Sequence, residues 1–230
     1  MELVAGAPQG ASRGACRLVV FDVDGTMVDS AATIVACAQA AFEAERLDIP
    51  TDEAVRRIVG LSLPQAMAVL LGHEDLLLAE RIAGHYRTAF FARRTAPGFE
   101  EPLFPGTLEL LEALAGRGLL MGVATGKAMR GLKAVLERHG IERHFVTLQT
   151  ADLHPSKPHP SMVEAAMRET GCDPAETLLV GDTTYDIEMA AAAGALPVGV
   201  AWGNHPAAEL EAAGAACILR RFDELLDLLD

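Results

Sequence analysis

The stretch LVVFDVDGT, residues 18–26, joins an unbroken apolar run to two carboxylates that are one residue apart. Four consecutive apolar residues predict a strand that is covered on both faces, as in a parallel sheet. Side chains alternate along a strand, so we expect Asp22 and Asp24 to point the same way at its carboxyl edge. Two carboxylates this close repel each other unless a cation or a hydrogen-bond network lies between them. Asp and Gly are also frequent in turns, so the stretch can be interpreted as a polar turn as well.

Strand and helix patterns alternate regularly from Thr107 to the end of the chain. Such alternation is typical of an α/β fold in which helices cover both faces of a parallel sheet. The sequence therefore predicts a doubly wound, Rossmann-like parallel sheet. Further strands are expected at residues 119–124, 145–148, 177–180, 196–201 and 216–218.

Residues 28–97 interrupt this alternation, because their patterns are all helical. Helices are expected from Ser30 to about Leu47, from Thr51 to near Gly60, from Pro64, and from Asp75 to Arg93. The segment TAPGFEEPLFPG, residues 95–106, is rich in proline and glycine and indicates a connector. We therefore expect an α/β core of residues 16–27 and 98–230, an inserted helical cap of residues 28–97, and a flexible N-terminal tail of residues 1–15. The cap could fold as a lid over the carboxyl ends of the strands, where open α/β sheets bind ligands.

A second acidic segment follows the predicted strand at 177–180. It reads Gly181-Asp182-Thr183-Thr184-Tyr185-Asp186 and places Asp186 one helical turn after Asp182. Taken alone, the segment could equally be a capping aspartate followed by a solvent-facing acid, without a functional role. Together with Asp22, these residues would gather three carboxylates at one sheet edge, and oxygen ligands of this kind suit Mg²⁺.

Two further segments carry groups that can bind phosphate. Thr125 and Gly126 follow the strand at 119–124, and a hydroxyl and a free N–H there can hold phosphate oxygens. Lys157 lies in the stiff loop Ser156-Lys157-Pro158-His159-Pro160 and is one of only three lysines in the chain. Separately, the first segment is more often a helix cap, and a single lysine is usually a solvated surface charge.

Composition limits the class of partner. The chain of 230 residues has a formal net charge of −13, which argues against non-specific binding to nucleic acid. No apolar stretch approaches the ~20 residues that span a bilayer, so no membrane partner is expected. The four cysteines are far apart and form no CxxC pair, which favours reduced thiols and a cytoplasmic location. They are Cys16, Cys37, Cys172 and Cys217.

The four segments together, DVDGT, TG, KP and GDTTYD, resemble the motifs of haloacid-dehalogenase-superfamily hydrolases, and the resemblance extends from about residue 17 to the end of the chain. The segments Val28-Asp29-Ser30 and Phe104-Pro105-Gly106 are similar to the phosphoglycolate-phosphatase-like branch. By this resemblance, Asp22 is a nucleophile that forms an aspartyl-phosphate, and Asp24 is the general acid and then the base.

The resemblance also implies the remaining site residues. Magnesium would be held by Asp22, by the backbone carbonyl of Asp24 and by Asp182. Thr125, the Gly126 N–H and Lys157 would bind the phosphate, and Asp186 would orient metal-bound waters or Lys157. The expected partner is a small phosphorylated metabolite, and the protein is expected to be a monomer or homodimer.

Differences from neighbouring branches narrow the expected activity. Dehalogenating members lack the second acid of the first motif, so Asp24 argues against C–halogen cleavage. Residues 28–97 contain no lysine, which argues against members that cleave a C–P bond through a cap lysine and weakens a phosphomutase interpretation. A phosphatase remains, with phosphoglycolate or another small sugar or nucleoside phosphate as substrate.

The cap offers only one candidate segment for substrate selection. The turn Gly60-Leu61-Ser62 could face the active site, although it could equally be an ordinary helix–helix turn. We assign no role to Arg56, Arg57, Arg87 or His73, because most arginines on helices are solvated.

Two other classes of protein remain as alternatives. A signalling receiver domain gathers similar residues, but it is shorter, has no helical insert and places its phosphorylated Asp later. A non-catalytic interaction protein on this fold is disfavoured by the complete set of motif residues.

Overall fold

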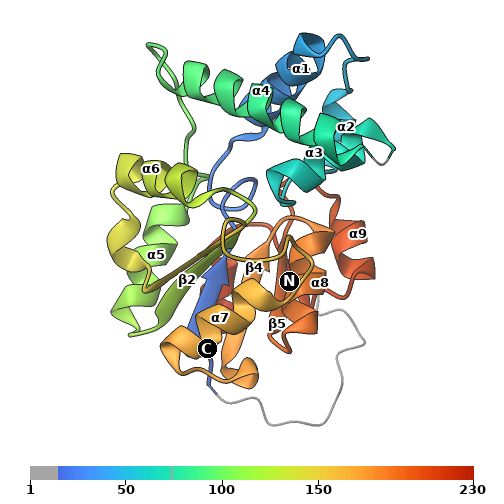
Figure 1. The fold of residues 1–230 in the computed structure, drawn as a ribbon. Coiled ribbons are helices and arrows are strands. Elements are labelled where there is room, and N and C mark those ends of the chain that lie inside the picture. Colours follow the sequence, from blue (N-terminus) through green and yellow to red (C-terminus); the bar gives the residue numbers. More distant parts are fainter. Residues whose placement is uncertain (1–14, 74) are drawn as a thin grey trace.

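The computed structural model describes residues 15–73 and 75–230, and within them it contains one six-stranded parallel sheet (Figure 1). The strand order is β3-β2-β1-β4-β5-β6, so the first strand of the chain lies in the middle. This confirms the predicted α/β fold class. The strands are β1 Leu18–Phe21, β2 Leu120–Thr125, β3 Thr147–Thr150, β4 Thr177–Gly181, β5 Leu196–Val200 and β6 Cys217–Leu219.

Strand register brings the ends of the three middle strands to one level. Phe21 in β1 pairs with Val123 in β2 and with Val180 in β4. The next residues along these strands are therefore neighbours at the carboxyl edge of the sheet. All four residues of β1 are fully buried, which explains why its sequence is apolar without alternation.

Helices cover both faces of the sheet. Val19 and Phe21 pack in one apolar cluster with α5, α6 and α10, whereas Leu18 and Val20 pack on the opposite face with α7 and α8. The core helices are α5 Thr107–Gly116, α6 Met129–His139, α7 Ser161–Thr170, α8 Thr184–Ala192, α9 Ala207–Ala212 and α10 Glu224–Leu228.

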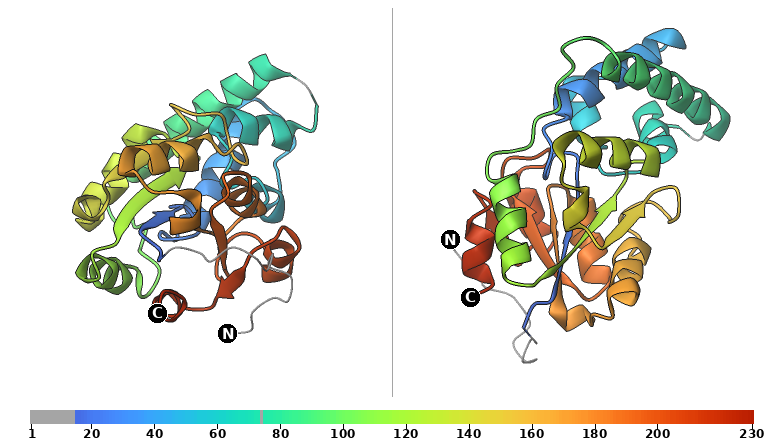
Figure 2. Two further views of the ribbon diagram at one scale, coloured as in Figure 1. Left: turned by 90° about the horizontal axis from the view of Figure 1, so that it is seen from below. Right: turned by 90° about the vertical axis from the view of Figure 1, so that its left-hand side faces the viewer.

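The helices between residues 31 and 94 form a separate layer with its own apolar cluster. Figures 1 and 2 show them standing beyond the carboxyl ends of the strands. They are α1 Ala31–Ala44, α2 Asp52–Arg56, α3 Leu63–Leu71 and α4 Leu76–Arg94. We call residues 28–97, the range predicted from the sequence, the cap.

The two connectors between cap and core run side by side. Asp29 N donates to Pro102 O over 2.9 Å, and Phe104 N donates to Met27 O over the same distance. Each connector is therefore braced by the other, and the only covalent paths into the cap lie next to each other.

Several element boundaries differ from the sequence-based expectation. The helix expected from Thr51 to near Gly60 is α2 and ends earlier, at Arg56. The strand expected at 145–148 is β3, Thr147–Thr150, because a 3-10 turn at Glu142–His144 precedes it and Val146 is exposed. The helix expected to reach about Leu47 ends at Ala44, since Arg46 adopts a positive φ of 57°. The predicted tail, apart from Ala15, lies outside the described residues. Among the described helices, none combines the length and apolar character needed to cross a membrane.

Candidate active site

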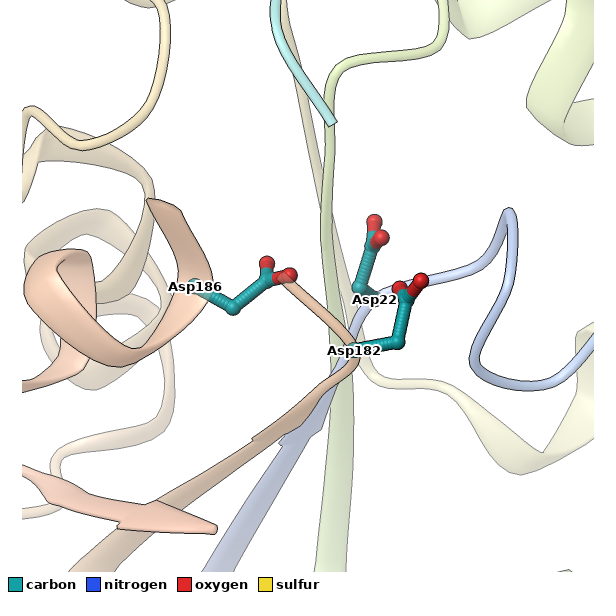
Figure 3. Close-up of side chains that lie close together, drawn as sticks. All are labelled: Asp22, Asp182 and Asp186. Carbon is teal, nitrogen blue, oxygen red and sulfur yellow. The ribbon is translucent and has the colours of Figure 1, made fainter. Parts of the chain in front are cut away.

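Three aspartates meet at the carboxyl edge of the sheet. Asp22 follows β1, Asp182 follows β4, and Asp186 lies in the first turn of α8. All three are buried, and each offers a carboxylate oxygen within 4.8 Å of the others. Figure 3 shows Asp22 and Asp182 next to each other, with Asp186 pointing toward them from α8. The structure thus brings together the carboxylates that the sequence placed at separate strand ends.

Asp182 is held by hydrogen bonds from both sides. Thr26 Oγ1 donates to its Oδ1 over 3.0 Å, while the Asn204 backbone N–H and side-chain amide donate to Oδ2, each over 2.8 Å. The loop containing Asn204 follows β5 and packs closely here. A Cβ added to Gly203 would lie 2.1 Å from the Asp182 Cβ, so only glycine allows this approach.

Lys157 is fully buried between two of the aspartates. Its Nζ lies 2.8 Å from Asp22 Oδ1 and donates to Asp186 Oδ1 over 2.6 Å. Thr183 N–H and Oγ1 donate to the other oxygen of Asp186. Burial lowers the pKa of Lys157, but Asp186 and then Asp22 outweigh it, so the pKa lies above its ordinary value and the ammonium stays charged.

Asp22 differs from the other two aspartates because neither of its buried oxygens accepts a well-directed hydrogen bond. Burial raises the pKa of Asp22 to about 8, although the nearby Lys157 lowers it. Burial also raises the pKa of Asp182 to about 6, and Asp186 adds to that rise. A divalent cation would stabilise a buried carboxylate that accepts no directed hydrogen bond and lies next to a second carboxylate whose pKa is also raised. The donor set therefore fits a hard cation such as Mg²⁺.

The Asp24 carboxylate contacts a different set of residues from Asp22. Its Oδ2 lies 3.0 Å from Lys127 Nζ, and Ser30 Oγ donates to its Oδ1 over 2.7 Å. Lys127 Nζ also lies 5.2 Å from the ring centroid of Phe90 in the cap. Burial lowers the pKa of Lys127, but Asp24 and then Glu101 outweigh it and raise that pKa. The Asp24 carboxylate is therefore fixed by Lys127 from the core and by Ser30 from the beginning of the cap.

The predicted turn of the cap lies directly on the predicted phosphate-binding segment. A Cβ on Gly126 would lie 2.4 Å from Gly60 O and 2.6 Å from Leu61 O. Ser62 N–H donates to Ser156 Oγ over 2.8 Å, next to Lys157. Thr125 is buried, and its hydroxyl accepts from the Lys127 N–H over 3.2 Å. The cap turn and the core loops are thus in contact.

A cavity of about 440 Å³ opens above these residues, between cap and core. Asp22, Asp24 and Thr125 line its base, and helix α4 and the Gly60–Leu61 turn line its walls. Of the cap residues left without a role above, Arg87 lines the cavity, whereas Arg57 forms an ion pair with Glu209 instead.

Several residues that build this site were not selected from the sequence. Lys127 directly follows Thr125 and Gly126, so its position in that segment was the available signal. Ser156 likewise precedes Lys157 in a segment that was recognised. Ser30 and Asn204 had no such signal, because a single serine in a connector or asparagine in a loop follows no local pattern.

Comparison with known proteins agrees with this geometry. A family model described as haloacid dehalogenase-like hydrolase matches residues 19–200. The chain is 38% identical over 214 residues to the probable phosphatase IndB of Dickeya dadantii, covering 91% of both proteins. It is 31% identical over 222 residues to a phosphoglycolate phosphatase of Synechococcus elongatus, covering 91% of this chain and 95% of that protein.

A solved structure shows the same fold. The putative haloacid dehalogenase-like hydrolase from Bacteroides fragilis superposes with a TM-score of 0.83 at 28% identity, covering 91% of this chain and 99% of that one. The match spans core and cap alike, and the motif residues lie at the carboxyl edge of the sheet. The chain therefore belongs to the haloacid dehalogenase-like hydrolases and is a phosphatase of that family.

Proposed function

We propose that the protein hydrolyses a small phosphomonoester through a covalent phosphoryl intermediate on Asp22, with Mg²⁺ as cofactor. The observation that carries this proposal is the state of Asp22 itself. It is buried at the base of the cavity, its oxygens accept no well-directed hydrogen bond, and Lys157 lies 2.8 Å away. A carboxylate in this position could attack the phosphorus atom of an ester bound in the cavity.

The proposed reaction has two steps. In the first, an Asp22 oxygen bonds to phosphorus, the bond from phosphorus to the ester oxygen breaks, and Asp24 gives its proton to the departing alcohol. In the second, Asp24 removes a proton from water, the water oxygen bonds to phosphorus, and inorganic phosphate leaves while the Asp22 carboxylate is restored. Proton transfers of this kind contribute about 10²–10⁴-fold to rate.

The transferring phosphoryl group needs donors for its oxygens, and three candidates lie at the same edge of the sheet as Asp22. These are the Thr125 hydroxyl, the Gly126 N–H and the Lys157 ammonium. Asp186 would act as a positioning residue, since it accepts the hydrogen bond that fixes Lys157. The cap turn at Gly60–Ser62 would close over the group and exclude water.

Asp22, Asp182 and the backbone carbonyl of Asp24 would hold the Mg²⁺ ion. When bound, the ion would neutralise charge between the nucleophile and the anionic ester. The side chain of Asp24 would not be a metal ligand in this arrangement, because its two oxygens contact Lys127 and Ser30. Phosphoglycolate is one candidate substrate, since relatives bear that name; a sugar or nucleoside phosphate and a phosphomutase reaction are the alternatives.

Trapping the phosphoryl-enzyme tests the proposal directly. The full chain is mixed with Mg²⁺ and acetyl phosphate, quenched in acid within one turnover, and weighed by intact-protein mass spectrometry with peptide mapping. We expect one added phosphoryl group on the peptide containing Asp22. Asp22→Asn should fold, show no adduct and release no phosphate, while the exposed Asp48→Asn should behave as the wild type. An adduct on another residue, or turnover by Asp22→Asn, would contradict the proposal.

A further inference from the structure

The cavity above Asp22 is larger than a two-carbon ester requires. Its volume is about 440 Å³, which lies within the ~300–1,000 Å³ range of pockets that hold much bigger ligands. In the proposed reaction the phosphoryl group would occupy only the base, next to Asp22 and Thr125. The remaining volume lies between cap and core and must accommodate the alcohol part of the substrate.

The wall that faces this remaining volume is mainly aromatic and aliphatic. Helix α4 contributes Tyr86, Phe90 and Phe91, and the rings of Tyr86 and Phe90 are stacked with centroids 6.1 Å apart and an interplanar angle of 18°. Aliphatic side chains complete the surface. They include Ile34, Ile58, Leu61, Leu63 and Met67. Binding of an apolar group to this surface is favourable because it removes apolar area from water. A short, charged alcohol would contribute little binding free energy there.

The cations of the cavity are compatible with a flat ring in the substrate. Lys127 forms an ion pair with Asp24, and Arg87 forms one with Glu80. Arg94 and Arg130 have no carboxylate partner among the described residues, and the Arg130 guanidinium already lies over the ring of Phe91, 5.8 Å from its centroid. Guanidinium groups at such a site attract phosphate or carboxylate groups and also stack on flat rings, so the aromatic wall, and not these cations, carries the choice of substrate class.

We infer that the preferred substrate is a phosphomonoester whose alcohol carries a hydrophobic aromatic ring, held against the wall formed by α4. This inference rests on the proposed phosphatase function and names the substrate class of that same site. The phosphoryl group would lie on Asp22 and the ring beside Tyr86, Phe90 and Phe91. Water would be displaced from both faces of the ring when the cap is closed.

The test compares esters that differ in the size of the alcohol but have similar leaving groups. Benzyl phosphate and ethyl phosphate form such a pair, and phosphoglycolate and adenosine 5′-monophosphate represent the carboxylated and the polar ring-bearing classes. We expect kcat/KM for benzyl phosphate to exceed that of each of the other three by about ten-fold or more, as pocket complementarity of this size allows. A higher kcat/KM for any of those three overturns the inference.

Variants of α4 show whether the aromatic wall is responsible. Phe90→Ala and Phe91→Ala should each reduce the ratio of kcat/KM for benzyl phosphate to that for ethyl phosphate by about three-fold or more. The ratio is the readout, because Phe90 also contacts Lys127 and its loss can affect both substrates. Leu77→Ala serves as the matched control, since Leu77 is an exposed side chain of the same helix and does not line the cavity. If both Phe variants leave the ratio unchanged, the wall does not select the substrate.

Failure of this inference and failure of the proposed function give different results. If the protein hydrolyses none of the esters, including acetyl phosphate, in the presence of Mg²⁺, the proposed function is wrong. If it hydrolyses acetyl phosphate and ethyl phosphate but shows no preference for benzyl phosphate, the proposed function stands and the substrate class is wrong.

Discussion

At the scale of single residues, the distinction between Asp22 and Asp24 is set by their partners. Asp22 faces Lys157 without a directed hydrogen bond, whereas Asp24 is fixed by Lys127 and Ser30. A nucleophile needs oxygen lone pairs that are not taken up by hydrogen bonds, and an acid–base group needs a fixed position near the leaving oxygen. The two neighbouring aspartates thus have environments that suit the two proposed roles.

Lys127→Met should lower kcat/KM for ethyl phosphate by about ten-fold or more, a part of the ~10²–10⁴-fold that acid–base groups contribute. The reason is that Asp24 loses the ammonium group that fixes its carboxylate. Lys133→Met is the matched control, because Lys133 is an exposed lysine of the following helix. The loss of kcat/KM should be smaller for acetyl phosphate, because its leaving group needs little protonation. Equal losses for both esters would assign Lys127 to phosphate binding instead.

Asp24→Asn should reduce kcat for ethyl phosphate by about 10²-fold or more, since it removes proton transfer to the alcohol. Its effect on acetyl phosphate should be clearly smaller. Magnesium affinity, measured by isothermal titration calorimetry, should change little because the proposed ligand at this position is a backbone carbonyl. A large loss of affinity would show that the Asp24 side chain takes part in metal binding.

The sequence predicted those site residues that follow apolar strands or lie in distinctive loops. Asp22, Asp182 and Thr125 are of the first kind, and Lys157 is of the second. Ser30 and Asn204 could not be found in this way, because their contacts depend on loops that meet only after folding. A residue that positions another side chain is identified by its contacts in the folded structure and not by the residues next to it in the sequence.

At the scale of elements, the cap turn and the phosphate-binding segment are fitted to each other. Gly126 faces the carbonyl oxygens of Gly60 and Leu61 so closely that no side chain fits between them. The sequence predicted a turn at Gly60, but it could not decide between a substrate-facing turn and an ordinary one. The decision depends on how far the cap approaches the core, which is a tertiary property.

Gly126→Ala should lower kcat/KM for acetyl phosphate by about ten-fold or more, because the added methyl group would lie 2.4 Å from Gly60 O and force the turn away. Secondary structure content, measured by circular dichroism, should be unchanged. Gly84→Ala is the control, since a Cβ at that position in α4 meets no other atom within 4 Å. Wild-type activity in Gly126→Ala would show that the contact is not needed for turnover.

Element boundaries show where pattern reasoning stops. The central strand β1 was predicted at its observed place because four buried residues leave an unmistakable apolar run. At β3 the prediction was two residues early, because Phe145 and Val146 are apolar although they lie before the strand. Apolar residues indicate burial on average, but they do not show at which residue the backbone begins to pair with the neighbouring strand.

At the scale of the whole molecule, cap and core touch through several backbone groups. The Arg57 carbonyl accepts from Tyr185 Oη over 3.1 Å and lies 3.2 Å from His205 Nε2. The hydrogen bond from Ser62 N–H to Ser156 Oγ adds a further contact between the cap turn and the core. In the proposed reaction such contacts would exclude water while Asp22 attacks phosphorus, but the cap would also have to separate from the core to admit substrate and release phosphate. The paired connectors are where this motion would be absorbed.

A disulfide across this contact tests whether opening is required. Ser62 N and Ser156 Oγ are 2.8 Å apart, so the two Cα atoms lie near enough for a disulfide, which spans about 4.4–6.8 Å. The variant Ser62→Cys with Ser156→Cys should lose at least about ten-fold in kcat for acetyl phosphate after oxidation and regain it on reduction, because product release needs an open cap. The single variant Ser62→Cys, treated in the same way, controls for the native thiols, of which three are buried. Full activity in a demonstrably cross-linked protein would mean that substrate and phosphate pass without separating the turn from the core, and the proposed hinge motion would then be wrong.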